Sequence, residues 1–127
     1  MNILVINAGS SSVKSSLFGV EDDTVMATGI VERIGLRGTQ LVYRNFRGDE
    51  IKTNAEVADT SQAIAAVMSL LMDEKLGVIR SKEEISAIGH RVVHGGEQIK
   101  SSALITPKVK RIIEDCFELA PLHNPPN

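Results

Sequence analysis

A glycine- and serine-rich segment that starts at Asn7 is the first candidate for chemistry in this sequence. Gly9 lets the backbone come close to a phosphate, because it has no side chain and tolerates positive φ. The turn amides and the hydroxyls of Ser10 and Ser12 can donate hydrogen bonds to an anion. Lys14 adds a mobile positive charge, and Asn7 presents an oxygen that can face Mg²⁺ or its waters.

The same segment also fits a purely structural role. It is not a P-loop, because it has no G-x-x-x-x-G-K-[ST] pattern and a strand is predicted to follow the turn. Glycine and serine dominate turns for structural reasons as well. A polar hairpin turn after a buried strand is therefore the alternative to a phosphate site.

The second candidate is the segment Gly-His-Arg-Val-Val-His-Gly-Gly-Glu, which contains Arg91 and Val93. Side chains alternate between the faces of a strand, so these two residues should share a face with Cα atoms about 7 Å apart. A guanidinium fork beside an apolar surface complements a small carboxylic acid, since arginine can bond both carboxylate oxygens. In the structural alternative, Arg91 only forms an ion pair with a surface carboxylate.

Three other groups carry weaker signals. His90 and His94 are spaced for a metal on a helix rather than on a strand, and no further ligands complete a tetrahedral zinc site. His123 could hydrogen-bond an anion, although its segment also reads as a proline stop after a helix. Cys116 falls on an apolar helix stripe and is expected in the core rather than as a nucleophile.

Composition limits the classes of partner. The 127 residues suit one domain, and 43% hydrophobic with 24% charged residues is typical of a globular chain. A net charge of -2 and the absence of tryptophan argue against a nucleic-acid or membrane partner. One cysteine permits no intrachain disulfide and predicts a cytoplasmic location. The chain's four-residue apolar run near the N-terminus is shorter than a leader or a membrane span requires, so neither is expected there.

Five strands and a helix are expected to hold the first candidate site. The predicted strands cover residues 3–6, 13–20, 24–34, 40–44 and 50–53. The first is apolar on both faces, which predicts a central strand covered on both sides. A helix is expected over 60–76, with Thr60 as its cap and Gly77 at its end. Its apolar stripe consists of Ile64, Val67, Leu70 and Leu71.

A strand over 85–93 and a second helix are expected to hold the arginine and the terminal histidine. Thr106 should cap this helix, Pro107 should begin it and Pro121 should stop it. Its predicted apolar face consists of Val109, Ile112, Ile113, Cys116 and Phe117. The order β-β-β, a small β excursion, α, β, α predicts a mixed-sheet α/β domain. The ending Pro-Pro-Asn reads as the start of a further element, so the domain is expected to be incomplete.

Three segments together resemble the acetate kinase family. They are the N-x-G-S-S-S-x-K hairpin at 7–14, the H-R-[VI]-V-H-G-G strand end at 90–96 and the P-x-H-N-P-x-N segment at 121–127. The three motifs occur in the family's order, and the resemblance covers essentially the whole chain. It implies that residues 1–127 are a truncated N-terminal domain without the C-terminal nucleotide-binding domain.

The resemblance implies a fold, a reaction and an assembly. The fold would be ribonuclease H-like, as in the sugar kinase, Hsp70 and actin superfamily. The reaction would be reversible transfer of the ATP γ-phosphoryl group to acetate, giving acetyl phosphate and ADP with Mg²⁺. Full-length members of the family are expected to form homodimers.

The resemblance also implies roles for eight residues. Asn7 would help to hold Mg²⁺ and the phosphates, and Arg91 would bind the acetate carboxylate or the transferring phosphoryl group. His123 would lie near the transferred group. The phosphate path would be lined by Ser10, Ser12 and Lys14, and part of the methyl pocket would be formed by Val93 and Leu122.

The chain departs from the family in its length. It lacks the downstream aspartate, second arginine, further histidine and metal-binding glutamate, so little or no kinase activity is expected from it alone. It should also expose surface that a second half would cover, which favours self-association. The alternatives are a propionate kinase, a non-catalytic phosphate- or nucleotide-binding module, and a subunit completed by another chain.

Overall fold

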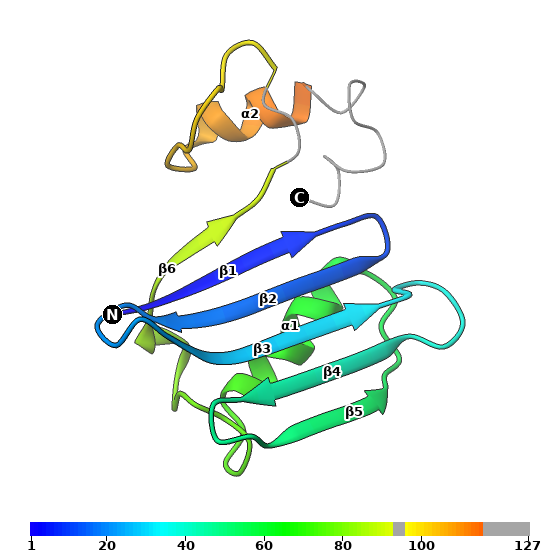
Figure 1. Ribbon diagram of the computed structural model, residues 1–127. Helices are drawn as coiled ribbons and strands as arrows, with labels where there is room; N and C mark the ends of the chain where they lie inside the picture. The colour runs from blue at the N-terminus through cyan, green and yellow to red at the C-terminus, as the bar shows by residue number, and fades with distance from the viewer. Residues whose placement is uncertain (93–95, 116–127) are drawn as a thin grey trace.

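The computed structural model describes residues 1–92 and 96–115, which form one six-stranded sheet and its helices (Figure 1). The strand order across the sheet is β5-β4-β3-β2-β1-β6. The strands are β1 (Asn2–Ala8), β2 (Ser12–Gly19), β3 (Thr24–Glu32), β4 (Gln40–Asn45), β5 (Glu50–Asn54) and β6 (Ile85–His90). The helices are α1 (Thr60–Leu71), the 3-10 turn η1 (Lys82–Glu84) and α2 (Pro107–Asp115).

The first five strands form an antiparallel meander, and β6 joins it in parallel with β1. The α1 helix lies in the connection that leads from the meander to β6, as a parallel neighbour requires. The prediction of a mixed-sheet α/β domain is therefore confirmed. The predicted bounds of the strands in the meander also agree with the structure to within about two residues.

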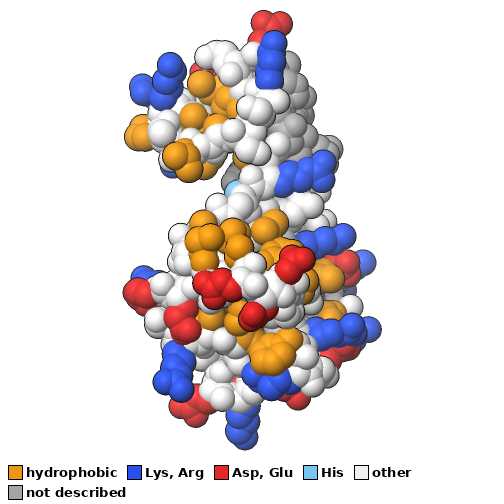
Figure 2. Space-filling view, turned by 60° about the vertical axis from the view of Figure 1, so that its left-hand side comes forward, with side chains coloured by type: hydrophobic (Ala, Val, Ile, Leu, Met, Phe, Trp, Pro, Cys, Tyr) orange, Lys and Arg blue, Asp and Glu red, His pale blue; other side chains and the backbone are white. Residues whose placement is uncertain are grey.

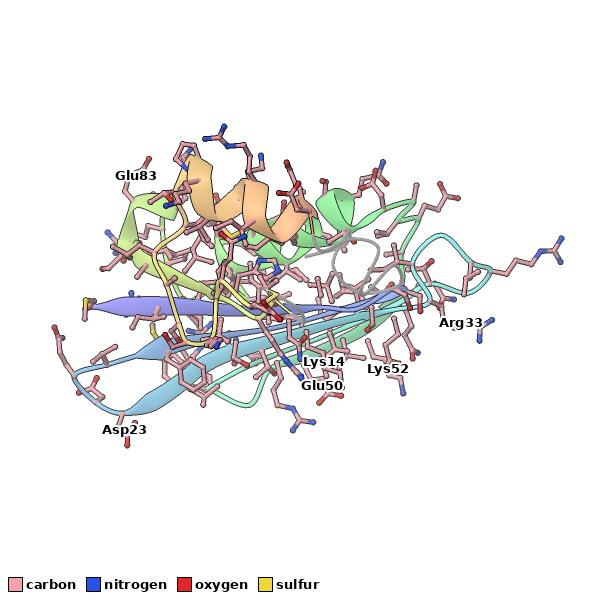
Figure 3. All side chains as sticks on the ribbon, turned by 90° about the horizontal axis from the view of Figure 1, so that it is seen from above. Lys14, Asp23, Arg33, Glu50, Lys52 and Glu83 are labelled. Atoms are coloured by element: carbon pink, nitrogen blue, oxygen red, sulfur yellow. The ribbon has the colours of Figure 1, made fainter. Side chains whose placement is uncertain are left out.

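The core lies between α1 and one face of the sheet (Figure 3). Strand alternation supplies its sheet side, because every second residue of β1 and β2 points toward the helix. The buried strand residues include Leu4, Ile6, Ala8, Val13 and Leu17, and the buried helix residues are Ala63, Val67 and Leu71. The opposite face carries no helix among the described residues. Val5 on that face is 39% exposed, so the expectation that β1 is covered on both sides is wrong for this part of the chain.

The α1 helix begins and ends at other residues than the sequence pattern predicted. Asp59, not Thr60, is the cap, because its carboxylate accepts a hydrogen bond from the Gln62 amide at 2.9 Å. The helix ends at Leu71, five residues before the predicted end. Beyond it, the Asp73 carboxylate accepts the backbone amides of the second and third residues that follow it, which turns the chain.

A polar cluster holds the segment after α1 against the β4–β5 hairpin. The Tyr43 hydroxyl donates to the Leu76 carbonyl at 2.8 Å, and Asn45 Nδ2 donates to the same oxygen at 3.0 Å. Arg47 donates to the Lys75 and Gly77 carbonyls at 3.2 and 3.0 Å. Gly77 is required here because a Cβ at this position would lie 2.4 Å from a backbone oxygen. It therefore closes this turn rather than ending the helix.

The α2 helix starts as predicted. The Val109 amide donates to Thr106 Oγ1 at 3.2 Å, and Pro107 is the first helical residue. The apolar residues Val109, Ile112 and Ile113 are only half-buried, and no described residue of α2 is fully buried. The predicted positions of Cys116, Phe117 and Pro121 lie outside the described residues. Within the described chain, neither helix has the length and apolar character needed to cross a membrane.

Candidate active site

The glycine-serine segment forms the turn between β1 and β2. The Gly9 amide donates to the Ser12 carbonyl at 2.8 Å, and the Ile34 amide donates to the Ser11 carbonyl at 2.9 Å. Gly9 does not adopt positive φ, so its left-handed freedom is not what the turn uses. A Cβ at Gly9 would lie 3.1 Å from Ser12 Oγ. The glycine therefore provides the space in which the Ser12 hydroxyl sits. Ser10 is exposed at the tip of the turn.

Asn7 and Lys14 are direct cross-strand partners at the end of the sheet. Their neighbours Ala8 and Val13 are buried against the helix side, so alternation places both polar side chains on the opposite face. Both are exposed there, and Figure 3 shows Lys14 on the side of the sheet away from α1. The hairpin thus presents an amide and an ammonium group next to each other.

Arg91 comes directly after β6, at the same end of the sheet. Its amide donates to the Ile6 carbonyl at 3.0 Å, and His90 pairs with Ile6 in the parallel ladder. Continuation of this register sets Arg91 beside Asn7 of β1, and Lys14 of β2 lies on the other side of Asn7. The predicted strand to residue 93 is too long, because β6 ends at His90.

The two cations at this end of the sheet have no acidic partner in the part of the chain that the structure describes. The ion pairs in that part join the N-terminus to Glu21, Arg44 to Glu50 and Arg47 to Asp49. In the structural alternative, Arg91 would form a surface ion pair. Within residues 1–92 and 96–115, Arg91 forms no such pair. An exposed guanidinium and an exposed ammonium group without ion-pair partners can attract an anion to this edge.

A hollow of about 390 Å³ lies between the end of β6 and the segment that carries α2. Its polar lining includes His90, Arg91 and Lys100, and its apolar lining includes Val109 and Ile113. Figure 2 shows the separation between this segment and the body of the sheet.

His90 is half-buried at the edge of this hollow, and its Nε2 atom is buried without a hydrogen-bond partner among the described residues. Burial lowers the pKa of the imidazole below its ordinary value, so the ring is neutral at pH 7. The sequence pattern suggested only a weak metal ligand here. The alternation of β6 could have identified it, because His90 shares the face of the buried Ile6.

Three residues of the predicted site lie outside the described part of the chain. They are Val93, Leu122 and His123, and His94 lies outside it as well. The predicted methyl pocket and the predicted place of His123 near the transferred group therefore remain predictions.

The described residues do not form a metal site on their own. No cluster of three or more His, Cys, Asp or Glu side chains occurs among them. Asn7 can supply one amide oxygen, whereas Mg²⁺ demands six ligands and usually keeps several waters. Any Mg²⁺ at this edge would therefore need its remaining ligands from waters, phosphates or other residues.

Comparisons with known proteins agree on one family. The family model of the acetokinase family matches residues 2–127. The acetate kinase of Halothermothrix orenii is 51% identical over 127 residues, which are 100% of this chain and 32% of that protein. The chain thus spans about a third of the length of the curated relatives it matches.

Solved structures are similar as well. A Porphyromonas gingivalis acetate kinase superposes with a TM-score of 0.92 at 44% identity, over 99% of this chain and 32% of that one. A Francisella tularensis propionate kinase superposes with a TM-score of 0.83 at 35% identity, over 98% and 31%. The predicted fold, an incomplete α/β domain of the sugar kinase and actin type, is thereby confirmed.

Proposed function

The chain belongs to the acetokinase family, and from this premise we propose that it supplies one wall of an acetate kinase active site. The reaction would be reversible transfer of the γ-phosphoryl group of ATP to acetate, giving acetyl phosphate and ADP. The observation that carries the proposal is the convergence of Asn7, Lys14 and Arg91 at one end of the sheet. Phosphoryl transfer depends mainly on positioning and on neutralising charge, and this edge offers both.

Each residue of this edge has a role that suits its chemistry. Lys14 and the hydroxyls of Ser10 and Ser12 would hold the phosphates, because ammonium and hydroxyl groups donate to phosphate oxygens. Arg91 would bind the acetate carboxylate or the transferring phosphoryl group through its planar fork. Asn7 would provide one oxygen toward Mg²⁺, which when bound would neutralise part of the phosphate charge.

The remaining roles fall on residues outside the described part. Val93 and Leu122 would contact the acetate methyl group, and His123 would lie near the transferred group. Acetate itself attacks phosphorus, so no strong base is required of this chain. The single cysteine supports a cytoplasmic location, and a homodimer is proposed for the longer polypeptide only.

A propionate kinase is the second candidate. The similarity to the Francisella tularensis propionate kinase supports it, because the two folds superpose over nearly the whole chain. The two functions differ by one methylene group of the acceptor, which is worth about 1–3 kcal/mol in a pocket. Rates with acetate and propionate would separate them.

We expect the 127-residue chain alone to have little or no kinase activity. Two cations at an open edge are exposed to water, where their attraction for a transition-state charge is weak. A coupled assay on the purified chain, with Mg²⁺, ATP and acetate, tests this directly. Turnover close to that of the Halothermothrix orenii enzyme would contradict it.

A chimera tests the proposed roles. Residues 1–127 would replace the matched stretch of the Halothermothrix orenii acetate kinase, and acetyl phosphate formation would be measured. We expect an active chimera that loses at least 100-fold in kcat/KM on Arg91→Ala, about 2.7 kcal/mol at 1.36 kcal/mol per tenfold. Arg44→Ala is the matched control, because Arg44 is an exposed arginine of the same sheet paired with Glu50. Equal losses in the two variants would refute the role of Arg91.

A further inference from the structure

The loop of residues 33–39 connects β3 to β4 and lies beside the glycine-serine turn, at the same end of the sheet (Figure 1). The Ile34 amide of this loop donates to the Ser11 carbonyl of the turn at 2.9 Å. This bond lies just beyond the last pair of the β2–β3 ladder, Ser12 with Glu32. It therefore attaches the turn to the loop where the ladder no longer joins the two segments.

One peptide group carries this bond. The Ile34 amide and the Arg33 carbonyl belong to the same planar unit and point in opposite directions. The Arg33 carbonyl accepts the Thr39 hydroxyl at 2.8 Å and the Leu36 amide at 3.1 Å. These two donors hold the carbonyl, so they also set the direction of the amide. Linked hydrogen bonds polarise one another, so the bonds to the carbonyl also strengthen the bond that the amide makes.

The backbone of the loop has a conformation that needs support. Arg33 adopts a left-handed φ of 60°, which is uncommon for residues other than glycine, and Gly35 and Gly38 adopt φ of 74° and 76°. A non-glycine residue stays in this region only where its surroundings fix it. The Arg33 Nε atom donates to the Arg37 carbonyl at 2.9 Å, but both residues are exposed, so water competes for this bond. The hydroxyl of the buried Thr39 is better shielded from water and is the stronger support.

Thr39 is 6% exposed, and its hydroxyl has the loop as its partner. The hydroxyl oxygen also lies 3.3 Å from the Leu36 carbonyl, but the shorter contact with Arg33 takes its single proton. The backbone of Thr39 is held separately, because its carbonyl accepts the Ala55 amide at 3.1 Å. Removal of the hydroxyl should therefore free the Arg33–Ile34 peptide group and leave the sheet in place.

We propose that Thr39 is a positioning residue for the phosphate-binding turn, and that it acts through the Arg33–Ile34 peptide group rather than by touching a substrate. The inference rests on the proposed function, in which Ser10 and Ser12 hold the phosphates. The loop fixes the Ser11 carbonyl, which lies between these two serines in the chain. Hydrogen bonds weaken steeply with poor geometry, so a turn that moves loses part of its attraction for phosphate.

The two substrates should respond differently to the loss of this hydroxyl. ATP would meet the turn through its phosphates, whereas acetate would meet Arg91, whose amide is held by the Ile6 carbonyl on β1. Thr39→Val removes the hydroxyl and keeps the shape of the side chain. Thr39→Ser keeps the hydroxyl and should behave as the wild type. Thr53→Val is the matched control, since the Thr53 hydroxyl is exposed on β5 and donates to the neighbouring Asn54 carbonyl.

Hydrogen exchange of single amides in the 127-residue chain, followed by nuclear magnetic resonance, tests the link between loop and turn. In Thr39→Val the Ile34 amide should exchange about tenfold faster, which corresponds to the loss of one hydrogen bond. The Gly48 amide, which donates to Asn45 in the β4–β5 turn, is the reference and should keep its rate. Thr39→Ser and Thr53→Val should leave both amides unchanged.

Kinetics of the chimera with the Halothermothrix orenii acetate kinase test the effect on substrates. Thr39→Val should raise the KM for ATP about tenfold and change the KM for acetate by less than about twofold. Thr39→Ser should restore the KM for ATP, and Thr53→Val should leave both values unchanged. A variant that had only lost stability would lower the active fraction, and with it kcat, without a change in either KM.

Four results would overturn the inference. These are an Ile34 amide that keeps its rate in Thr39→Val, an equal acceleration of the Gly48 amide, a KM for ATP that stays unchanged or rises together with that for acetate, and a Thr39→Ser variant that behaves as Thr39→Val. If Thr39→Val alters the circular dichroism, Thr39→Ala takes its place. A loss of fold in both variants would also overturn the inference, because Thr39 would then be a structural residue.

The proposed function can fail separately from this inference. An inactive wild-type chimera would contradict the proposed function, and the exchange of the Ile34 amide would then decide whether Thr39 positions the turn. An active chimera whose KM for ATP does not respond to Thr39→Val would leave the proposed function standing and overturn the inference.

Discussion

Asn45 is the residue whose loss should most clearly separate the β4–β5 hairpin from the segment after α1. Its side chain is 4% exposed in a strand that otherwise buries apolar residues. Oδ1 accepts the amides of Arg47 and Asp49 at 3.0 and 3.1 Å. Nδ2 donates to the Leu76 carbonyl and to the Asp49 carboxylate, both at 3.0 Å. One side chain thus forms the hairpin turn and attaches it to a distant loop.

Asn45→Ala should lower the free energy of unfolding by about 2–3 kcal/mol. Each of the three bonds to backbone groups is worth roughly 1 kcal/mol net. The bond to the Asp49 carboxylate adds little, because that carboxylate is 49% exposed and well solvated. The two backbone amides that lose their acceptor lie in a turn that water can reach. Water can replace part of the lost hydrogen bonding, so the expected loss of stability does not exceed about 3 kcal/mol.

Urea unfolding followed by far-ultraviolet circular dichroism measures this loss. Tyr43 is the only tyrosine and there is no tryptophan, so its fluorescence reports the same cluster independently. Asn54→Ala is the control, because Asn54 is exposed on the next strand and should change stability by less than about 0.5 kcal/mol. A loss below about 1 kcal/mol for Asn45→Ala, or equal losses for both variants, would refute the reasoning.

Three further predictions concern the core and the hollow. Tyr43→Phe removes the hydroxyl that donates to the Leu76 carbonyl and should lower the free energy of unfolding in urea by about 1 kcal/mol. An unchanged free energy of unfolding would contradict a stabilising role of this hydrogen bond. Gly29→Ala places a Cβ 3.0 Å from both Val67 methyl groups and should cost about 1–3 kcal/mol by overpacking, seen as a lower Tm. Burial lowers the pKa of His90, so the unfolded chain binds the extra proton and stability should fall as pH drops below about 6.5. His90→Gln should lack this part of the pH dependence between pH 7.5 and 5.5, and an unchanged slope would contradict it.

The local elements could be predicted from the sequence where side-chain alternation and turn residues act together. The hairpin at the N-terminus is an example, since its register follows from a short turn between two strands, and it brings Asn7 opposite Lys14. The helix cap was misassigned because both Asp59 and Thr60 can cap. Gln62 lies three residues after Asp59, and this spacing favours Asp59 as the helix cap.

The part of the site that depends on distant pairing was not visible in the sequence. The pattern extends the last strand to residue 93, whereas β6 ends at His90 although its partner β1 continues to Ala8. Periodicity does not reveal where a parallel pairing ends. For the same reason, the position of Arg91 next to Asn7 could be inferred only from family resemblance. The burial of His90 likewise depends on which face of β6 meets the core.

The parallel pairing of β1 with β6 also has a consequence for the order of folding. The meander from β1 to β5 joins strands that are neighbours in sequence, so its loops close at little entropic cost. The pairing of Leu4 with Ile88 closes almost the whole described chain and should form late in the folding transition. Substitutions in β6 should then accelerate unfolding more than they slow folding. Arg91 would therefore reach the hairpin only after the rest of the sheet has assembled.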